Sequence, residues 1–330
     1  MQRTDIQPNH RTLIDSAVHA AFPQAEWSPV TILGGGLSAS TLYQLAIGDH
    51  HYVARLTPPD DPRSILEEEY AATALAAAQG IAPPLYYAEP KMGIMLSAFV
   101  QNQPLFRPNG EGPKLVPTLA QLVRTLHQGR AFVQTLSLFE KTEYIFKALS
   151  PAFQALPLVV EALALKRKLA TILNDPADLR PCHCDLNPNN VLFDGKQLWL
   201  IDWTTAGQEN FYFDLATCAN FFFFRSAEAE EAFLQSYFER PLTETEAEKY
   251  AQMRTFCAIY YGLIFIYMSS LRDASPLRNA EITALPSYPD FMALVRTGQA
   301  NLSEPVAQQS LGFIYLKRAL VAQPAGLCYS

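Results

Sequence analysis

Hydrophobic and polar residues alternate with a period of two along much of the first hundred residues, which is the pattern of half-buried β-strands. The predicted strands span residues 30–33, 41–47, 51–56, 85–88 and 93–99. The turn Gly48-Asp49-His50 joins the second and third of them as a β-hairpin. Apolar residues recur at helical spacing at residues 10–21, before the strands, and at residues 64–79. The pattern predicts a small lobe that is mostly antiparallel sheet with one helix at 64–79, preceded by the helical segment.

Beyond residue 104 the spacing of apolar residues changes to that of helices. Predicted helices span residues 115–127, 158–173, 227–237, 245–268 and 305–321. One strand pair interrupts them at residues 191–193 and 198–201, joined by the turn Asp194-Gly195. We therefore expect an α+β, bilobed protein, with a small antiparallel-sheet N-lobe at residues 1–101 and a larger, mostly helical C-lobe at residues 102–330. Residues 102–104 are the expected hinge.

Composition and charge exclude several classes of function. The chain is 49% hydrophobic and 17% charged, which is typical of a folded globular protein. Residues 1–100 hold 5 basic and 10 acidic residues and residues 101–330 hold 20 and 22, so they carry −5 and −2 of the total −7. Without a basic stripe, a nucleic-acid partner is not expected. The longest apolar run, residues 257–268, is shorter than the roughly 20 residues of a membrane span.

The five cysteines are scattered along the chain. Cys182 and Cys184 flank His183, but no second cysteine pair stands at metal-binding spacing. The first ten residues are polar and contain no apolar segment of a secretory signal. These features favour reduced thiols in a cytoplasmic protein over disulfides or a zinc site.

The densest group of reactive side chains lies between His183 and Asp202. Asp185 and Asn190 are five residues apart on a proline-bearing loop, and Asp202 follows the strand pair. Because a hairpin returns the chain beside its start, Asp202 is expected next to Asn190. Two oxygen ligands there can hold Mg²⁺, while Asp185 orients and deprotonates a hydroxyl group. A polar turn before an ordinary hairpin is the alternative, but it does not account for the combined spacing and strand–turn–strand context.

This pattern resembles the aminoglycoside phosphotransferase and choline/ethanolamine kinase family. The matching segments are His183-x-Asp185-Leu186-x-x-x-Asn190, Ile201-Asp202-Trp203, Ala206-Gly207 and Asp214-Leu215-Ala216. The resemblance covers about residues 31–222 and implies a protein-kinase-like fold that uses ATP and Mg²⁺. It implies phosphate transfer to the hydroxyl of a small molecule, with Asp185 as base and Asn190 and Asp202 as metal ligands. It also implies that His183 and Asp214 have structural roles.

The resemblance places the nucleotide in the N-lobe, whose function is then nucleotide binding. A glycine-rich loop brings backbone N–H groups close to phosphate, and the hinge backbone binds adenine. The residues expected to do so are Gly35, Gly36, Leu37, Ser38, Ala98, Phe99 and Val100. Asn102 stands where the family often has glycine, and asparagine also tolerates a positive φ angle.

A strand cation and a helix carboxylate complete the expected phosphate site. Arg55 stands at the end of a strand, where a guanidinium can bind phosphate in a bidentate manner. Glu69 is expected to hold Arg55. Glu68 is the alternative, because neighbouring residues point about 100° apart on a helix.

The expected partner is a small-molecule acceptor bound by the C-lobe. Trp203, Glu209 and Tyr261 are the candidate substrate-binding residues, because aromatic faces and a carboxylate suit an amine. Thr204 and Thr205 stand where choline-kinase-like sequences commonly have glutamate and an aromatic residue. This departure weighs against a choline site. We therefore expect a broad class of acceptor, a choline- or ethanolamine-like amino alcohol, an amino sugar or a related metabolite.

Three alternatives remain at this point. An aminoglycoside-type antibiotic phosphotransferase would meet a large polycation with a C-lobe whose net charge is only −2. A nucleotide-binding pseudokinase would act as a binding module, although the base and both metal ligands are present. A metal-dependent hydrolase using His183, Asp185 and Asp202 would lack a second histidine at useful spacing.

Overall fold

The computed structural model describes residues 2–34, 40–59, 65–105, 114–134, 136–272 and 275–321, which form two compact units. Unit 1 comprises Met1–Gln134, Arg180–Gln208 and Ala232–Arg240, and unit 2 comprises Thr135–Leu179, Glu209–Glu231 and Pro241–Ser330. Residues 180–208, which hold the predicted catalytic residues, thus belong to the same unit as the N-terminal sheet. The division into lobes at residues 101 and 102 falls inside unit 1 and stays a prediction.

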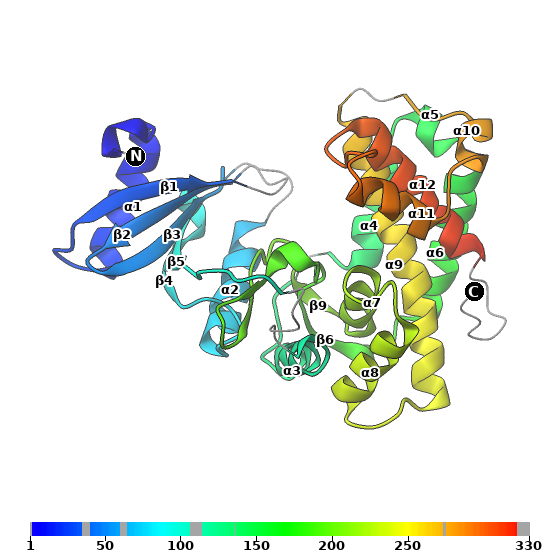
Figure 1. The fold of residues 1–330 in the computed structure, drawn as a ribbon, viewed down its shortest axis with the longest axis horizontal. Coiled ribbons are helices and arrows are strands. Elements are labelled where there is room, and N and C mark those ends of the chain that lie inside the picture. The colour runs from blue at the N-terminus through cyan, green and yellow to red at the C-terminus, as the bar shows by residue number, and fades with distance from the viewer. Residues whose placement is uncertain are drawn as a thin grey trace. The chain divides into compact units, whose positions relative to one another are not determined.

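Unit 1 is built on a five-stranded antiparallel sheet in the order β1-β2-β3-β5-β4 (Figure 1). The strands are β1 (Trp27–Leu33), β2 (Thr41–Ile47), β3 (His50–Leu56), β4 (Leu85–Glu89) and β5 (Ile94–Ala98). All five strands were predicted, although β1 begins at Trp27, earlier than expected. Leu42 and Met95 flank Arg55 on the neighbouring strands.

Two helices cover this sheet, and they match the helical spacing predicted at residues 10–21 and 64–79. Helix α1 (Pro8–Ala21) packs through Ile14 and Val18 against Leu45 and Leu96 on one face. Helix α2 (Leu66–Ala78) packs through Leu66 and Tyr70 against Met95. Because side chains alternate along a strand, Met95 and Leu96 lie on opposite faces, and Arg55 shares the face of Met95. Strand periodicity thus turns Arg55 away from the core under α1.

The remaining elements of unit 1 include helix α3 (Leu115–His127) and the hairpin of β7 (Val191–Phe193) and β8 (Leu198–Leu200). The hairpin register pairs Val191 with Leu200 and Phe193 with Leu198, as the Asp194-Gly195 turn predicts. Strands β6 (Leu179–Cys182) and β9 (Gly207–Asn210) and helix α8 (Ala227–Phe238) each contain residues of both units. Short 3₁₀ turns lie at Arg3–Asp5, Pro90–Met92, Pro176–Asp178 and Pro188–Asn190.

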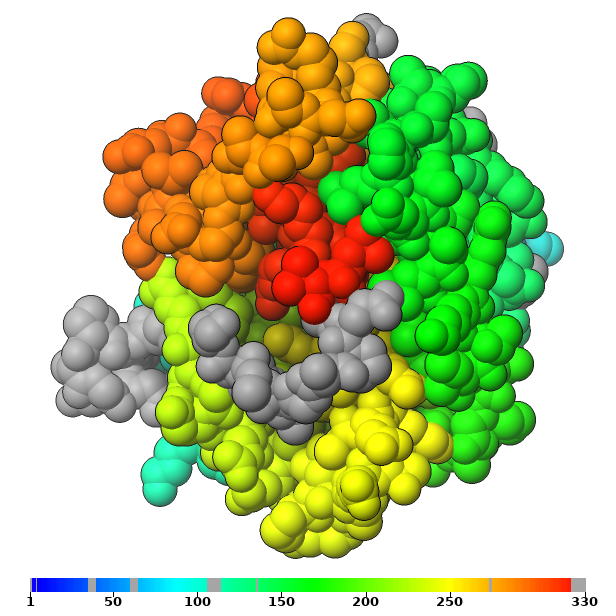
Figure 2. Space-filling model, turned by 90° about the vertical axis from the view of Figure 1, so that its right-hand side faces the viewer, coloured from blue at the N-terminus to red at the C-terminus, as the bar shows by residue number. Residues whose placement is uncertain are grey.

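Unit 2 is helical. Its helices are α4 (Leu138–Ala148), α5 (Pro151–Gln154), α6 (Pro157–Ile172), α7 (Tyr212–Phe221), α9 (Glu244–Ser270), α10 (Asn279–Thr283), α11 (Tyr288–Arg296) and α12 (Pro305–Val321). Helix α9 contacts α4, α6, α7 and α12 and is the centre of the bundle. On the face seen in Figure 2, the red α12 segment lies between the green segment of α4 to α6 and the orange segment of α10 and α11.

Helices α9 and α12 approach closely at two glycines. A Cβ atom on Gly312 would lie 2.7 Å from the backbone oxygen of Gly262, and one on Gly262 would lie 3.0 Å from the oxygen of Gly312. Only residues without a side chain fit both positions. Among the helices that the structure describes, none is long and apolar enough to cross a membrane.

Candidate active site

The loop between β6 and β7 orients the carboxylate of Asp185 through Asn190. The side-chain Nδ2 of Asn190 donates to Asp185 Oδ2 and to the Asp185 backbone oxygen, both at 2.9 Å. Asn190 is buried, whereas Asp185 is only half-buried. Because Nδ2 makes both bonds, Oδ1 of Asn190 points away from Asp185 as an acceptor. One side chain thus fixes the candidate base and offers an oxygen of the kind that Mg²⁺ prefers.

His183 fastens this loop to the chain that follows β8. Its Nε2 lies 2.9 Å from the backbone oxygen of Ile201, and the N–H of Asp185 donates to its Nδ1 at 3.3 Å. A carbonyl oxygen only accepts, so Nε2 carries the proton and Nδ1 is the acceptor. The fully buried ring therefore uses both nitrogens to hold backbone in place. This is the geometry that the predicted structural role requires.

The hairpin of β7 and β8 brings Asp202 back beside the loop. The N–H of Ile201 donates to the backbone oxygen of Asn190 at 3.0 Å, so Asp202 follows directly after a residue bonded to Asn190. Both Asp202 and Cys184 have φ of +64°, a left-handed backbone that is uncommon outside glycine. Such conformations cluster at functional sites, where the surrounding structure holds them.

Arg55 joins the sheet to Asp202. Its Nη1 lies 2.5 Å from Glu69 Oε1, and its Nη2 lies 3.8 Å from Asp202 Oδ1. Nη2 also donates to Thr204 Oγ1 at 3.2 Å, and Nε donates to Ser40 Oγ at 3.2 Å. Thr204 in turn donates to Asp202 Oδ1 at 2.7 Å. The guanidinium is thus held on three sides by two carboxylates and two hydroxyl groups.

Glu69 is the carboxylate of α2 that faces Arg55. It is 1% exposed, whereas Glu67 is exposed and Glu68 is half-buried. Burial, reinforced by the Glu69 carboxylate, raises the pKa of the neighbouring Tyr70 well above its ordinary value. The low local polarity that causes this shift also strengthens the Arg55–Glu69 ion pair.

The contacts of Asp202 within the described part of the chain leave room for a cation. Its side chain is 42% exposed, and its contacts with Arg55 and Thr204 both use Oδ1. Asp202 Oδ2 and Asn190 Oδ1 are therefore oxygens of the type that binds Mg²⁺, on two residues that the hairpin brings together. The residues present fit a magnesium site.

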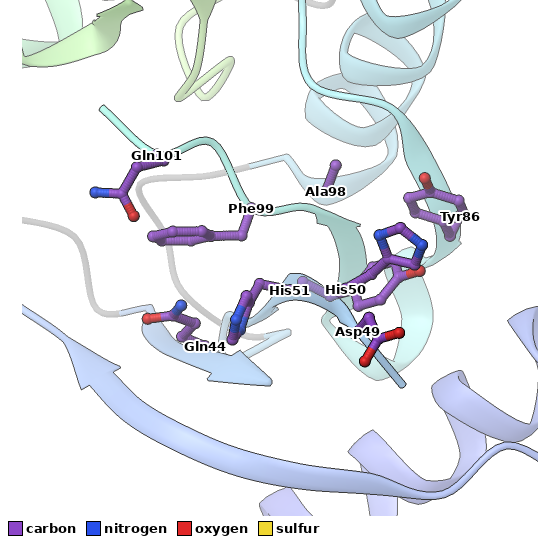
Figure 3. A pocket seen from close by; sticks show the side chains of 9 residues that line it. Gln44, Asp49, His50, His51, Tyr86, Ala98, Phe99 and Gln101 are labelled. Atoms are coloured by element: carbon purple, nitrogen blue, oxygen red, sulfur yellow. The ribbon is translucent and has the colours of Figure 1, made fainter. Parts of the chain in front are cut away.

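The hinge that follows β5 is held at two amide groups. The N–H of Ala98 donates to the oxygen of Pro84 at 2.8 Å, and the N–H of Phe99 donates to that of His51 at 3.0 Å. Neither bond uses the N–H of Val100. Beside the hinge lies a cavity of about 490 Å³ (Figure 3). Its lining is Gln44, Asp49, His50, His51, Tyr52, Tyr86, Ala98, Phe99 and Gln101.

Asn102 does not have the positive φ angle that the comparison with glycine suggested. Its side-chain Oδ1 instead accepts from the N–H of Phe193 at 3.0 Å, and the N–H of Gln103 donates to the oxygen of Phe193 at 2.7 Å. Asparagine thus ties the hinge segment to β7, which glycine could not do.

The other predicted residues lie in several environments. Gly35, Gly36, Leu37 and Ser38 fall outside the described residues. Trp203 is 2% exposed and packs between the rings of His183 and Phe132, so its predicted role as a substrate face gains no support.

Glu209, Tyr261 and Asp214 are buried in unit 2. The carboxylate of Glu209 accepts from the N–H of Leu138 at 2.6 Å, at the start of α4. Tyr261 on α9 packs against aromatic rings, including Phe213 and Phe221. Asp214 lies in the first turn of α7, and its tie to the catalytic loop stays a prediction.

Three polar contacts of the site were not predicted: those of Ser40 and Thr204 with Arg55 and that of Asn102 with Phe193. The Asp202-x-Thr204 spacing was a usable signal, because hydroxyl and carboxylate side chains two residues apart often bond locally. Nothing in the local sequence links Ser40 or Asn102 to partners so distant along the chain.

Comparison with known proteins shows the family to which the chain belongs. Residues 29–255 match the model of a family described as the phosphotransferase enzyme family. A thiamine kinase from Escherichia coli is 27% identical over 209 residues, which cover 63% of this chain and 71% of that protein.

Two solved structures show the same fold. The choline kinase LicA from Streptococcus pneumoniae has a TM-score of 0.66 at 15% identity, covering 94% of this chain and 97% of that one. A spectinomycin phosphotransferase in complex with ADP and spectinomycin has a TM-score of 0.59 at 14% identity, covering 94% and 98%. The expected protein-kinase-like fold is confirmed. Since the family model spans more than half of the sequence, the chain belongs to the phosphotransferase enzyme family and is a small-molecule kinase.

Proposed function

We propose that the protein transfers the γ-phosphate of ATP, with Mg²⁺, to a hydroxyl group of a small molecule, and that Asp185 is the base. The observation that carries this proposal is the set of contacts linking Asp185, Asn190, Asp202 and Arg55 within one unit. Base, metal ligands and phosphate-binding cation are the parts that phosphoryl transfer requires.

In this proposal Asp185 accepts the proton of the acceptor hydroxyl while that oxygen attacks the γ-phosphorus. The bond to the bridging oxygen breaks, and ADP leaves. Because Asn190 holds Asp185 Oδ2 at 2.9 Å, the carboxylate is oriented before substrate arrives. Positioning of this kind, with charge neutralisation, supplies most of the rate enhancement in phosphoryl transfer.

Asn190 Oδ1 and Asp202 Oδ2 would hold Mg²⁺, which neutralises charge on the phosphates when bound. Arg55 would bind the phosphates, and its ion pair with Glu69 keeps the guanidinium in place. Thr204 would keep Asp202 turned so that Oδ2 stays available, because it donates to Oδ1. The glycine-rich loop, with Gly35, Gly36, Leu37 and Ser38, stays the predicted cover of the phosphates.

The base of the nucleotide would lie at the hinge, against the carbonyl of Ala98 and the N–H of Val100. His51 and Arg55 share one face of β3, and four residues of strand span about 13 Å. A nucleotide laid along this strand would place its base by the cavity beside His51 and Phe99 and its phosphates by Arg55. That cavity has the size range of small-molecule sites.

The acceptor predicted from the sequence, an amino alcohol or amino sugar, needs a carboxylate for its ammonium group. Glu209 was the candidate, but it accepts from the first turn of α4. An aminoglycoside-type acceptor meets the same difficulty. A pseudokinase is disfavoured because the base and the metal ligands form an ordered set.

The test is an ATP-dependent transfer assay with a panel of amino alcohols, amino sugars, neutral sugars and hydroxy acids. We expect a phosphorylated acceptor with the wild type, and a loss of about 10²- to 10⁴-fold in kcat for Asp185→Asn. ATP binding, measured by calorimetry, should survive that substitution. Thr12→Val, on the exposed face of α1, is the control.

Full activity of Asp185→Asn would refute the assigned base. Tight Mg²⁺–ATP binding without transfer to any acceptor of the panel would favour the pseudokinase instead. Unchanged Mg²⁺-dependent nucleotide binding in Asp202→Asn would remove the metal assignment.

A further inference from the structure

Two arginines and two tyrosines form a cluster in unit 2, on α9, α11 and α12. The guanidinium carbon of Arg318 lies 4.5 Å from the ring centre of Tyr288 and 5.8 Å from that of Tyr315. The two tyrosine hydroxyl groups are 3.3 Å apart. Arg254 is close enough that its charge disfavours the charge of Arg318. We call Arg254, Tyr288, Tyr315 and Arg318 the Arg318 cluster.

Arg318 has no counter-ion within the part of the chain that the structure describes. Its Nη1 is buried and has no hydrogen-bond partner among those residues. Burial lowers the pKa of Arg318, and the neighbouring Arg254 shifts it in the same direction. A guanidinium stays charged at neutral pH even so. Arg318 as a whole is half-buried, so its charge is only partly removed from water. Even partial removal from water without an acidic partner costs free energy, which an anion would offset.

Among the described residues Arg254, unlike Arg318, has an acidic partner, which is Glu230. Its Nε lies 3.6 Å from Glu230 Oε1, and its Nη1 donates to Asn220 Oδ1 at 2.8 Å. The hydroxyl of Tyr250 donates to the same Glu230 oxygen at 2.5 Å. The carboxylate of Glu230 is thus bound by Arg254 and Tyr250. It does not neutralise the positive charge of Arg318.

The acidic side chains nearest to Arg318 cannot supply the missing negative charge. Burial raises the pKa of Cys257, which lies within reach of both arginines, to about 12. Burial raises the pKa of Tyr315 well above its ordinary value, and the hydrogen bond with Tyr288 adds to this shift. Thiol and phenol therefore stay neutral at physiological pH, and neither supplies a counter-ion for Arg318.

The Arg318 cluster lies next to Tyr261, which is a candidate substrate-binding residue on sequence grounds. The ring of Tyr315 lies 6.3 Å from that of Tyr261 and stacks parallel to Phe265 at 6.1 Å. A planar cation beside aromatic rings suits a ligand that joins an apolar ring to a carboxylate or phosphate. A cationic ligand would be repelled by Arg318.

We propose that the Arg318 cluster binds an anionic group, a carboxylate or a phosphate, of a small molecule. The cluster lies wholly in unit 2, and the binding of an anion there does not depend on the proposed kinase function.

The test uses three probes of one shape and different charge: para-hydroxymethylbenzoate, benzyl alcohol and para-hydroxymethylbenzylamine. Inorganic phosphate is a fourth probe and separates phosphate from carboxylate recognition. Binding to the full chain is measured by calorimetry, and phosphorylation is measured separately with ATP. We expect the benzoate or phosphate to bind and the benzylamine not to bind. Arg318→Gln should weaken anion binding about 10- to 100-fold, the effect of one lost hydrogen bond to a charged group.

Arg296→Gln is the matched control, since Arg296 ends α11 and is exposed. Arg318→Met tests, in the absence of any ligand, whether Arg318 lacks a counter-ion in the folded protein. Because it removes an uncompensated charge, we expect the Tm of the ligand-free protein to stay level or rise. A clear fall in Tm would mean that Arg318 has a structural partner and would overturn the proposal.

The remaining outcomes concern the anion site alone. Equal binding of an anionic probe to wild type and Arg318→Gln would overturn the site, whether or not the probe is phosphorylated. Failure of every anionic probe to bind would also overturn the anion site.

Discussion

Arg55 Nη2 lies 3.8 Å from Asp202 Oδ1, so the central strand β3 and the segment that follows the β7–β8 hairpin meet through opposite charges. The hydroxyl of Thr204 contacts both, as the acceptor from Arg55 and the donor to Asp202. In the proposed reaction Arg55 binds the phosphates and Asp202 binds Mg²⁺. Thr204 is therefore the residue through which a change at the phosphate site reaches the metal ligand.

Thr204→Val removes this bridging hydroxyl at nearly constant volume. We expect the Mg²⁺ concentration needed for half-maximal activity to rise several-fold, because Asp202 loses the donor that fixes Oδ1. The loss of a hydrogen bond to a charged group is worth about 1.5–3 kcal/mol. Thr204→Ser should restore the wild-type Mg²⁺ dependence. An unchanged Mg²⁺ titration in the valine variant would show that Thr204 only fills space.

Asn102→Ala should loosen the tie between hinge and hairpin. The Phe193 N–H loses its acceptor, at a cost of about 1 kcal/mol. We expect faster amide hydrogen exchange at Phe193 and a higher KM for the nucleotide, with kcat little changed. Asn102→Asp keeps an acceptor oxygen and should protect the amide. Equal exchange rates in wild type and Asn102→Ala would exclude the tie.

Glu143 supports a buried ammonium in unit 2, and its contribution should depend on pH. Lys166, whose side chain is 4% exposed, lies 3.1 Å from Glu143 Oε1, and Arg167 contacts the same oxygen at 3.0 Å. The hydrogen bond from Arg167, helped by Lys166, lowers the pKa of Glu143 although burial opposes this. A carboxyl group with a lowered pKa in the folded state stabilises it above the unfolded pKa, and loses that effect as the pH falls.

Glu143→Gln should therefore lower the Tm at pH 7, because it leaves the Lys166 ammonium buried without its partner. For this partly exposed pair we expect a loss of about 2 kcal/mol. The difference in Tm from the wild type should shrink as the pH falls through the lowered pKa of Glu143, below its ordinary value of 4.5. Thermal unfolding at a series of pH values measures this. A difference in Tm that stays constant with pH would contradict the ionic explanation.

Gly312→Ala should destabilise the bundle of unit 2. The new methyl group would lie 2.7 Å from the Gly262 backbone oxygen and 2.7 Å from Ile266 Cγ1, so α9 and α12 must separate. Overpacking of this kind costs about 1–3 kcal/mol. Thermal unfolding checks it, with Ala251→Ser on the exposed side of α9 as control. A Tm equal to that of the wild type would mean that the helices are not in contact there.

How far each helix could be predicted follows from its burial. Helix α3 was predicted with the bounds that the structure has, because its buried residues recur on one face. Helix α7 was missed because nearly all of its residues are buried, which leaves no polar face and no period. Helix α4 was also missed, although Ser137 and Glu140 form a capping box that its sequence displays.

The sequence by itself determined the five strands of the N-terminal sheet, the β7–β8 hairpin, the α3 pattern and the spacing of Asp185, Asn190 and Asp202. These are local properties, because side-chain periodicity and a short hairpin depend on residues close together in the chain. Strands β6 and β9 were not predicted. Only the tertiary structure decided that Glu69 and not Glu68 meets Arg55. It also gave Glu209 a capping bond with α4, and left Arg318 without an acid among the described residues. Those outcomes depend on burial and on partners far apart in sequence, and no local pattern of residues encodes them.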